Sequence, residues 1–288
     1  MDVFRLQKPD TKDKLDHAIE VVNRGGDIFR FVEGTNTPEY LFWDKVRYKP
    51  RPDGLSAEEF WALIKLLRQH SPARVKTVVR SADGEYFSWQ PIPGMDYFLH
   101  EVDMHLGGAL ESRIADDRTV RKQLITRGIM EEAIASSQLE GANTTRKMAK
   151  RIILEGKKPS SRSEQMIVNN YRVMIDVEDT LRYEKLTMNL LLDIHAMLVK
   201  DTVQTDEVGR LRLEKDQVVV GDASSNVIYH TPPPVGFLKA EIRRFIEYAN
   251  DGSKKHRFVH PLIKAIILHF WIGYLHPFTD GNGRLART

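Results

Sequence analysis

The chain has 288 residues, of which 41% are hydrophobic and 29% are charged, a composition typical of a globular protein and not of a disordered or collagen-like chain. Its 43 basic and 40 acidic residues leave a net charge of +3, which is too balanced to indicate binding to nucleic acid. The chain contains no cysteine, so disulfides and thiolate metal sites are excluded.

The lack of cysteine is compatible with a reducing compartment, and we expect a cytoplasmic protein. The N-terminus has no basic segment followed by an apolar run, so no signal peptide is expected. The longest apolar stretch, 261–275, is interrupted by Lys264 and His269 and is shorter than a membrane span. We therefore expect no membrane association, and the scattered tryptophans indicate no surface for stacking bases, so nucleic acid is not expected as a partner.

The first 95 residues predict a small mixed region of helices and strands. The expected elements are a helix over 13–23, an extended segment over 28–32, a helix over 57–71, and strands over 75–79 and 85–89. Ser56 and Glu59 have the spacing of a capping box, which indicates the start of the second helix. Asp83 and Gly84, between the two strands, are typical of a tight hairpin turn. No motif in this region indicates a function.

From residue 96 onward the sequence predicts a helical domain over 96–288. Helices are expected over 96–112, 118–140, 144–155, 162–184, 187–200, 234–250 and 259–275. β-Branched runs on either side of a Gly-Asp-Ala-Ser-Ser-Asn turn predict a hairpin over 211–234. The helix over 259–275 is apolar on nearly every face, so we expect it to be the most buried helix. The predicted fold class is mainly α, with a β-hairpin on a helical body and a smaller mixed α/β region, 1–95, before it.

The segment over 276–287 directly follows this apolar helix and reads His-Pro-Phe-Thr-Asp-Gly-Asn-Gly-Arg-Leu-Ala-Arg. Gly281 and Gly283 allow successive backbone N–H groups to converge on an anion. A short helix is expected over about 283–288, and its start would add the positive end of a helix dipole. Taken alone, Asp-Gly-Asn-Gly would be an ordinary turn, so the prediction of an anion site depends on the whole combination.

Four charged or titratable side chains in this segment complete the prediction. Arg284 and Arg287 are three residues apart on one helical face and could clamp a phosphate chain. Asp280 is an oxygen ligand suited to a phosphate-bound Mg²⁺. His276 is the only group of the segment that can accept a proton near neutral pH. Together they predict a phosphate-transfer site with a base, a metal ligand and a charge clamp.

The segment resembles the signature of the Fic family, His-x-Phe-x-Asp/Glu-Gly-Asn-Gly-Arg-x-x-Arg, at every defined position. The resemblance extends over about residues 100–288 and implies a Fic-like helical core that transfers AMP from ATP to a Ser, Thr or Tyr hydroxyl of a protein. It implies that His276 deprotonates the hydroxyl, that Phe278 anchors the loop in the core and that Asp280 holds Mg²⁺. The phosphate-binding residues that it implies are Gly281, Asn282, Gly283, Arg284 and Arg287.

A second motif lies in the helix expected over about 118–141. Ser136, Glu140 and Gly141 fit the Ser/Thr-x-x-x-Glu-Gly/Asn pattern of the Fic inhibitory helix. The resemblance implies that Glu140 pairs with Arg287 and prevents productive binding of the γ-phosphate of ATP. The physical reason is that a carboxylate in that place competes with phosphate for the same guanidinium. By this resemblance the chain is an autoinhibited AMP transferase.

The hairpin over 211–234 corresponds to the flap of Fic proteins, which holds the target segment beside the active site by adding a strand. Its candidate target-binding residues are Val218, Val219, Val220, Val227, Ile228 and Tyr229. An ordinary structural hairpin stays an alternative. Because main-chain pairing reads little sequence, the flap does not identify the target.

Two other functions stay open from sequence alone. The same site could remove AMP from a modified protein, with Glu140 orienting a water molecule, or the chain could be a catalytically silent module that senses nucleotide or binds protein. Phosphate-transferring relatives have a lysine where Gly283 stands, so this sequence points away from that branch. Fic cores continue past the motif, so the resemblance also implies a core cut short at Thr288.

The resemblance implies ATP as substrate and Mg²⁺ as cofactor. It also implies a target protein as partner. The chain itself is one candidate for that target, and a homodimer is one candidate assembly.

Overall fold

The computed structural model describes residues 9–24, 28–105, 118–222, 227–251 and 258–288. The described chain is mainly helical, with two small two-stranded sheets, so the predicted fold class is confirmed. It divides into two compact units, one made of residues 1–77 and 87–110 and the other of residues 78–86 and 111–288. No helix in the described ranges has both the length and the apolar composition needed to cross a bilayer.

The first unit is built around four helices, α1 (Leu15–Asn23), α2 (Ile28–Asn36), α3 (Trp43–Val46) and α4 (Ala57–Gln69). Their shared core includes Phe60 and Ile64 of α4, both fully buried. The predicted capping box starts α4: the Ser56 hydroxyl accepts from the Glu59 N–H at 3.3 Å, and the Ser56 N–H donates to the Glu59 carboxylate at 2.7 Å.

The extended segment predicted over 28–32 is wrong, because these residues begin helix α2. Ile28, Val32 and Thr35 are its buried residues, and their spacing of four and three is that of one helical face. A short run of apolar and aromatic residues between glycines and polar residues does not distinguish a strand from a helix. The burial of one face of this segment, which depends on packing in the folded chain, favours the helix.

The two predicted strands are present as β1 (Val75–Arg80) and β2 (Tyr86–Trp89). The tip of this hairpin belongs to the second unit, where the Arg80 guanidinium donates to the carboxylate of Glu241 at 2.7 Å. Glu241 is fully buried and also pairs with Arg244, so two cations compensate one buried carboxylate. Helix α5 (Met95–Asp103) follows the hairpin, and the rest of the helix predicted over 96–112 lies mainly outside the described residues.

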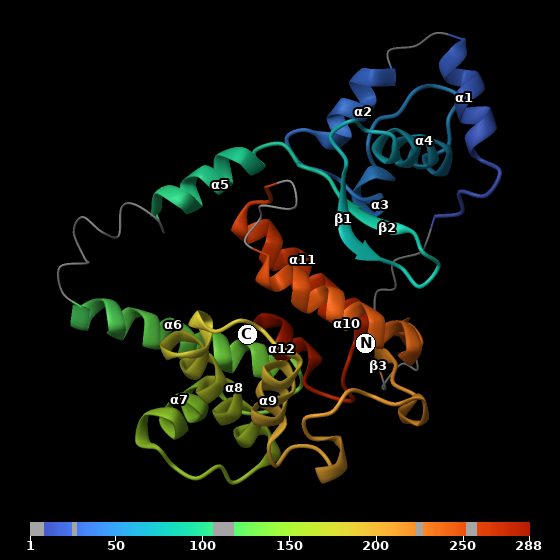
Figure 1. The fold of residues 1–288 in the computed structure, drawn as a ribbon. Helices are drawn as coiled ribbons and strands as arrows, with labels where there is room; N and C mark the ends of the chain where they lie inside the picture. The colour runs from blue at the N-terminus through green and yellow to red at the C-terminus, as the bar shows by residue number, and fades with distance from the viewer. Residues whose placement is uncertain (1–8, 25–27, 106–117, 223–226, 252–257) are drawn as a thin grey trace. The chain divides into compact units, whose positions relative to one another are not determined.

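The second unit is a helical body that carries the predicted motifs (Figure 1). Its helices are α6 (Arg118–Leu139), α7 (Arg146–Glu155), α8 (Arg162–Asp179), α9 (Met188–Val199), α10 (Val235–Asn250), α11 (Pro261–Leu275) and α12 (Asn282–Arg287). Helix α8 packs against α6, α7 and α9, and α12 packs against α6, α9 and α11. The helix predicted over 162–184 ends at Asp179 and is followed by a short 3-10 turn, Leu181–Tyr183.

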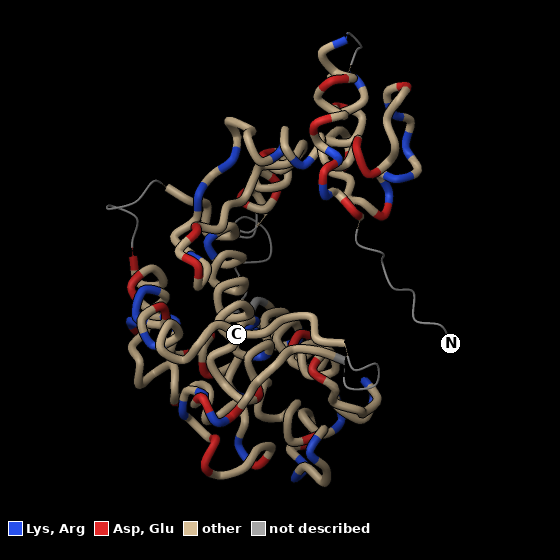
Figure 2. Tube along the Cα trace, turned by 90° about the vertical axis from the view of Figure 1, so that its right-hand side faces the viewer, with Lys and Arg blue, Asp and Glu red and all other residues tan. Residues whose placement is uncertain are grey.

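Helix α11 is only partly the buried helix that its composition predicts. Trp271 is fully buried and packs edge-on against Phe245 of α10, with ring centroids 5.8 Å apart. On another face, however, Ile266 is 56% exposed and Phe270 is 43% exposed. The helix is apolar all round, but within the described chain its neighbours cover only part of its surface. Figure 2 shows Lys and Arg interspersed with Asp and Glu along both units, as the small net charge implies.

We expect replacement of Ser56 by Ala to lower the free energy of unfolding of the first unit by about 1 kcal/mol, because the Glu59 N–H would lose its acceptor. Replacement by Thr, which keeps a hydroxyl, serves as the control. Chemical denaturation followed by the fluorescence of Trp61, a buried residue of α4, measures the difference. Equal stability of the Ala variant and the parent would contradict the cap's contribution.

Candidate active site

The predicted motif forms a loop between α11 and α12. Helix α11 ends at Leu275, and His276 adopts a left-handed conformation with φ 45° and ψ 61°. Its N–H still donates to the Ile272 carbonyl at 2.8 Å, which ends the helix with a hydrogen-bonded turn. The chain therefore changes direction at the histidine itself, and the imidazole is fixed to the end of a buried helix.

Arg212 holds this loop from the other side, and the sequence analysis did not identify it. Its buried guanidinium donates to the carbonyls of His276 at 2.9 Å and Leu275 at 3.3 Å, and its backbone N–H donates to the Pro277 carbonyl at 2.8 Å. The same guanidinium also donates to the Pro233 carbonyl, in the segment before α10. One arginine thus joins the end of α11, the motif loop and the segment that follows the hairpin.

Phe278 lies in the core, as predicted, and it stacks on His195 of α9 with ring centroids 3.7 Å apart and an interplanar angle of 7°. The Nδ1 atom of His195 accepts from the Gly209 N–H at 3.2 Å, so its Nε2 carries the proton that is donated to the Asp280 carbonyl at 3.1 Å. Burial lowers the pKa of His195 to about 4, although the Asp280 carbonyl opposes this shift. His195 is therefore a neutral residue that fixes the middle of the loop.

The imidazole of His276 is neutral at neutral pH for a related reason. Burial lowers its pKa, and electrostatic interactions with His230 and Arg212 lower it further, while a hydrogen bond to the Gly273 backbone and the charge of Glu140 oppose the shift. A neutral imidazole can accept a proton. The physical environment of His276 thus suits a general base.

Asp280 is held by two arginines. Its Oδ1 atom accepts from the Gly281 N–H at 2.5 Å and from Arg284 Nη2 at 3.3 Å, and its Oδ2 atom accepts from Arg162 Nη2 at 2.7 Å. Arg162, at the start of α8, was not predicted from the sequence. Among the described residues no cluster of three or more His, Cys, Asp or Glu side chains could hold a metal alone.

Asp280 fits a divalent cation that arrives with a nucleotide, since Mg²⁺ commonly binds through one or two carboxylates and the phosphates of the substrate. The Nε atom of Arg284, beside this carboxylate, is buried and has no hydrogen-bond partner in the described chain. Because this atom is buried, it does not reach a phosphate, and the fit of the site to a cation depends on the Asp280 carboxylate, whose side chain is 30% exposed.

Two of the predicted phosphate-binding side chains, those of Asn282 and Arg284, make hydrogen bonds within the protein. The side chain of Asn282 is buried, and it accepts from the Phe278 N–H at 2.9 Å and donates to the Phe278 carbonyl at 2.8 Å. Arg284 is fully buried and donates to the Leu198 carbonyl at 2.8 Å. The two arginines three residues apart therefore do not form one clamp, because Arg284 points into the core and Arg287 toward α6.

Glu140 and Arg287 are in contact. Their Oε1 and Nη2 atoms are 2.5 Å apart, and Arg287 also donates to the Ser136 hydroxyl at 2.7 Å and the Ser136 carbonyl at 3.2 Å. A Cβ atom built on Gly283 would lie 1.9 Å from Oε1 of Glu140. The carboxylate thus lies directly against the first turn of α12, where helix N–H groups lack intrahelical partners. Gly141, the last residue of the motif, has φ +89°, which suits glycine at the end of α6.

The predicted flap is a shorter hairpin than its sequence indicates. The strands are β3 (Val220–Asp222) and β4 (Val227–His230), so Val218 and Val219 lie outside them, and the turn at 223–226 lies outside the described residues. Ile228 and Tyr229 of β4 are 61% and 67% exposed. Val220 pairs with His230, and Asp222 with Val227, in antiparallel register.

A cavity of about 440 Å³ brings the predicted site residues together. It is lined by Glu140, Val220, His230, His269, Phe270, Gly273, Tyr274, His276, Asn282, Gly283 and Ala286. His276, Glu140, the first turn of α12 and the hairpin therefore share one cavity. His230 and His269 were not predicted to lie here, and each donates one hydrogen bond to a backbone carbonyl, that of Tyr274 at 2.8 Å and that of Ala286 at 3.0 Å respectively.

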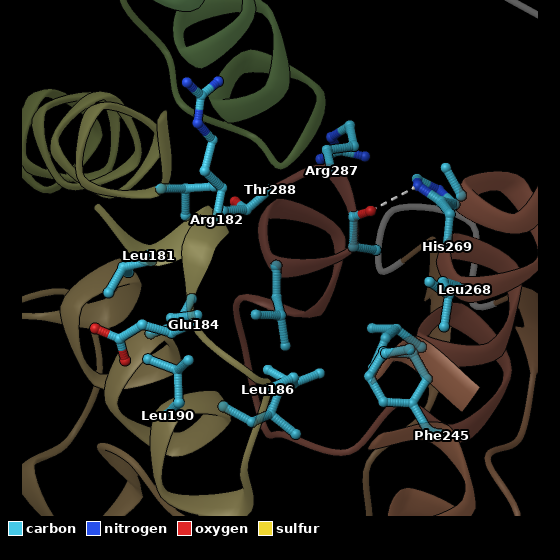
Figure 3. Close-up of a pocket in the computed structure, with 18 residues that line it drawn as sticks. Leu181, Arg182, Glu184, Leu186, Leu190, Phe245, Leu268, His269, Arg287 and Thr288 are labelled. Carbon is cyan, nitrogen blue, oxygen red and sulfur yellow. Dashed lines mark hydrogen bonds between the residues drawn. The ribbon is translucent and has the colours of Figure 1, made fainter. Parts of the chain in front are cut away.

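A second, more apolar cavity of about 390 Å³ lies on the other side of α12 (Figure 3). Leu186, Leu190 and Phe245 point into it, and Arg287 and Thr288 lie at its edge. His269 and Ala286 border both cavities, and the hydrogen bond between them is drawn in Figure 3. This wall of α11 and α12 separates the apolar cavity from the cavity that contains His276.

A histidine, a carboxylate and arginines thus lie around the first turn of a short helix. Residues 185–288 match the Fic/DOC family, so the chain contains a Fic/DOC family domain. The chain is 27% identical to protein adenylyltransferase Fic of Nematostella vectensis over 58% of this chain and 37% of that protein. It is 32% identical to the protein of the same name from Drosophila mojavensis over 35% of this chain and 18% of that protein. The chain thus spans well under half of these relatives.

Solved structures agree on the fold. A Fic family protein from Desulfovibrio desulfuricans G20 matches with a TM-score of 0.53 and 22% identity, over 69% of this chain and 56% of that chain. A Fic domain containing signaling protein from Bacteroides thetaiotaomicron matches with a TM-score of 0.50 and 20% identity, over 66% of this chain and 68% of that chain. The helical body therefore has the fold of Fic proteins.

We expect acid to destabilise the helical body through His195. Because the pKa of His195 in the folded protein is about 4 and its ordinary value is 6.5, its contribution to stability is complete above pH 6.5 and is lost as the pH falls toward about 4. The difference corresponds to at most about 3 kcal/mol. Denaturant unfolding between pH 7 and pH 4 measures it, and His195→Gln, which does not titrate, should lose this component. An NMR titration of His195 with a midpoint near 6.5 would contradict the prediction.

Proposed function

We propose that the chain is a protein adenylyltransferase that moves AMP from ATP onto a Ser, Thr or Tyr hydroxyl of a protein target. One observation carries this proposal: His276, in the environment of a general base, shares a cavity of about 440 Å³ with the first turn of α12. The Fic/DOC match and the relatives named protein adenylyltransferase Fic support AMP transfer as the reaction.

In the proposed reaction, the neutral imidazole of His276 takes the proton of the target hydroxyl. The hydroxyl oxygen forms a bond to the α-phosphorus of ATP, the bond from that phosphorus to the bridging oxygen breaks, and pyrophosphate leaves. The backbone N–H groups at the start of α12 and the guanidinium of Arg287 bind and orient the phosphates. Asp280 would hold Mg²⁺, which supplies positive charge to the phosphates when it is bound.

We further propose that Glu140 inhibits this reaction in two ways. Its carboxylate occupies the guanidinium of Arg287, with 2.5 Å between Oε1 and Nη2. It also fills the space next to Gly283, where a phosphate oxygen would approach the first turn of α12. A bound phosphate must displace the same carboxylate from both places, so the two effects act together. The hairpin, with Ile228 and Tyr229 exposed, is the proposed surface for the target segment.

Removal of AMP from a modified protein is the second candidate, because Glu140 and His276 line the same cavity. In that reaction the carboxylate of Glu140 would orient a water molecule instead of excluding a phosphate. The two candidates predict opposite effects of removing Glu140. Loss of its carboxylate would increase AMP transfer, but it would abolish AMP removal.

Replacement of His276 by Ala should lower transfer by at least about a hundredfold, because no other group would take the hydroxyl proton. The measurement uses ATP labelled on the α-phosphate with Mg²⁺, and counts label on added proteins and on the chain itself. Binding of ATP to the variant, measured in parallel, should change little. Transfer that persists at the parent rate would remove His276 from the role of base.

Replacement of Glu140 by Gly should raise transfer about tenfold or more, the size expected for loss of a charged, partly buried competitor. Glu131→Gln, at an exposed ion pair with Lys150 on α7, is the matched control and should have no effect. No increase with Glu140→Gly, together with faster release of AMP by the parent, would favour AMP removal.

A further inference from the structure

Arg162 occupies a place in the site that neither the sequence signature nor the proposed reaction assigns to it. It is the first residue of α8, following the helix cap in which the Ser161 hydroxyl accepts from the Glu164 N–H at 3.2 Å. Its Nη2 atom contacts Asp280 Oδ2 at 2.7 Å, and its Nε atom donates to the Thr202 carbonyl at 2.9 Å. The guanidinium is thus held in place by two separate contacts.

The second oxygen of Asp280 is the one that Arg162 occupies. Oδ1 already accepts from the Gly281 N–H and from Arg284, which is fully buried. Oδ2 has Arg162 as its partner in the described chain. A cation that binds Asp280 through an oxygen not engaged by the loop must therefore use Oδ2, and it meets Arg162 there.

The two arginines that contact Asp280 differ in how easily they can withdraw from its carboxylate. The side chain of Arg162 is 56% exposed, and that of Arg284 is completely buried. A solvent-exposed ion pair contributes little net stability, since water screens its charges and the freed side chain regains conformational freedom. Withdrawal of Arg162 costs little, whereas withdrawal of Arg284 would leave a charge buried without a partner.

We infer that Arg162 is a positioning residue that holds the place of the divalent cation at Asp280 and competes with it. While no cation is bound, Arg162 neutralises the carboxylate and keeps Oδ2 directed toward the start of α8. When a cation arrives with the nucleotide, the two positive groups repel one another at this oxygen, so Arg162 gives way. This inference rests on the proposed function only in taking Asp280 as the cation ligand.

The test measures the cation requirement of nucleotide binding, with no chemical turnover. The full chain carrying His276→Ala and Glu140→Gly is the parent, and a fluorescent ATP analogue at one fixed concentration is titrated with Mg²⁺. Adding Arg162→Gln should lower the half-saturating Mg²⁺ concentration about two- to fivefold, the range of an exposed ion pair. Association of Mg²⁺ with nucleotide in solution is the same in every arm and cancels.

Two further variants separate competition from general effects of charge and folding. Arg146→Gln removes the same charge from another exposed ion pair, with Glu131 at 3.4 Å, and should leave the half-saturating concentration unchanged. Arg162→Lys keeps the positive charge and should stay close to the parent. An unchanged or higher half-saturating concentration in Arg162→Gln, at an unchanged melting temperature, would overturn the inference.

Asp280→Asn in the same parent distinguishes failure of the inference from failure of the proposed site. If Mg²⁺ tightens nucleotide binding in the parent and not in Asp280→Asn, the cation binds Asp280 and the Arg162 result is decisive. If Asp280→Asn responds to Mg²⁺ as the parent does, the cation binds elsewhere and the inference falls with that site. Transfer of AMP is judged separately, from the labelling experiment with His276→Ala.

Discussion

The buried guanidinium of Arg212 joins the carbonyls of His276, Leu275 and Pro233, and every feature of the site depends on the loop that it holds. The positive charge of Arg212 is tolerated here because it donates to several carbonyls at once. Burial of this arginine would be costly if any of these acceptors moved. The left-handed turn at His276 is therefore held by Arg212, which is 64 residues away in sequence. This contact also sets where the His276 side chain lies.

The remaining arginines of the site are paired with carboxylates within the protein. Asp280 neutralises part of the charge of Arg162 and Arg284, and Glu140 neutralises Arg287. A nucleotide brings several negative charges, and its cation brings two positive ones, so both kinds of ion pair must exchange partners when it binds. The proposed autoinhibition by Glu140 and the proposed competition by Arg162 both follow from these ion pairs, one acting on the phosphates and the other on the cation.

The sequence predicts the motif loop because 276–287 is contiguous, and it predicts the helices because their apolar residues are periodic. It identifies Glu140 only through a resemblance, since 147 residues separate it from Arg287. Arg212, His195 and Arg162 were missed because their roles depend on distant segments that only folding brings together. The segment at 28–32 was assigned wrongly for the same reason: burial on one side of α2, and not local pattern, makes it a helix.

The structure also divides the motif between residues that shape the loop and residues that face the cavity. Both polar atoms of the Asn282 side chain form hydrogen bonds with the backbone of Phe278, and Arg284 is completely buried in the core. In this arrangement a phosphate would meet mainly backbone N–H groups and Arg287, the arginine that Glu140 also reaches. Arg287 is 20% exposed and Arg284 is completely buried, so the proposed inhibition by Glu140 acts on the more accessible of the two guanidinium groups of the motif.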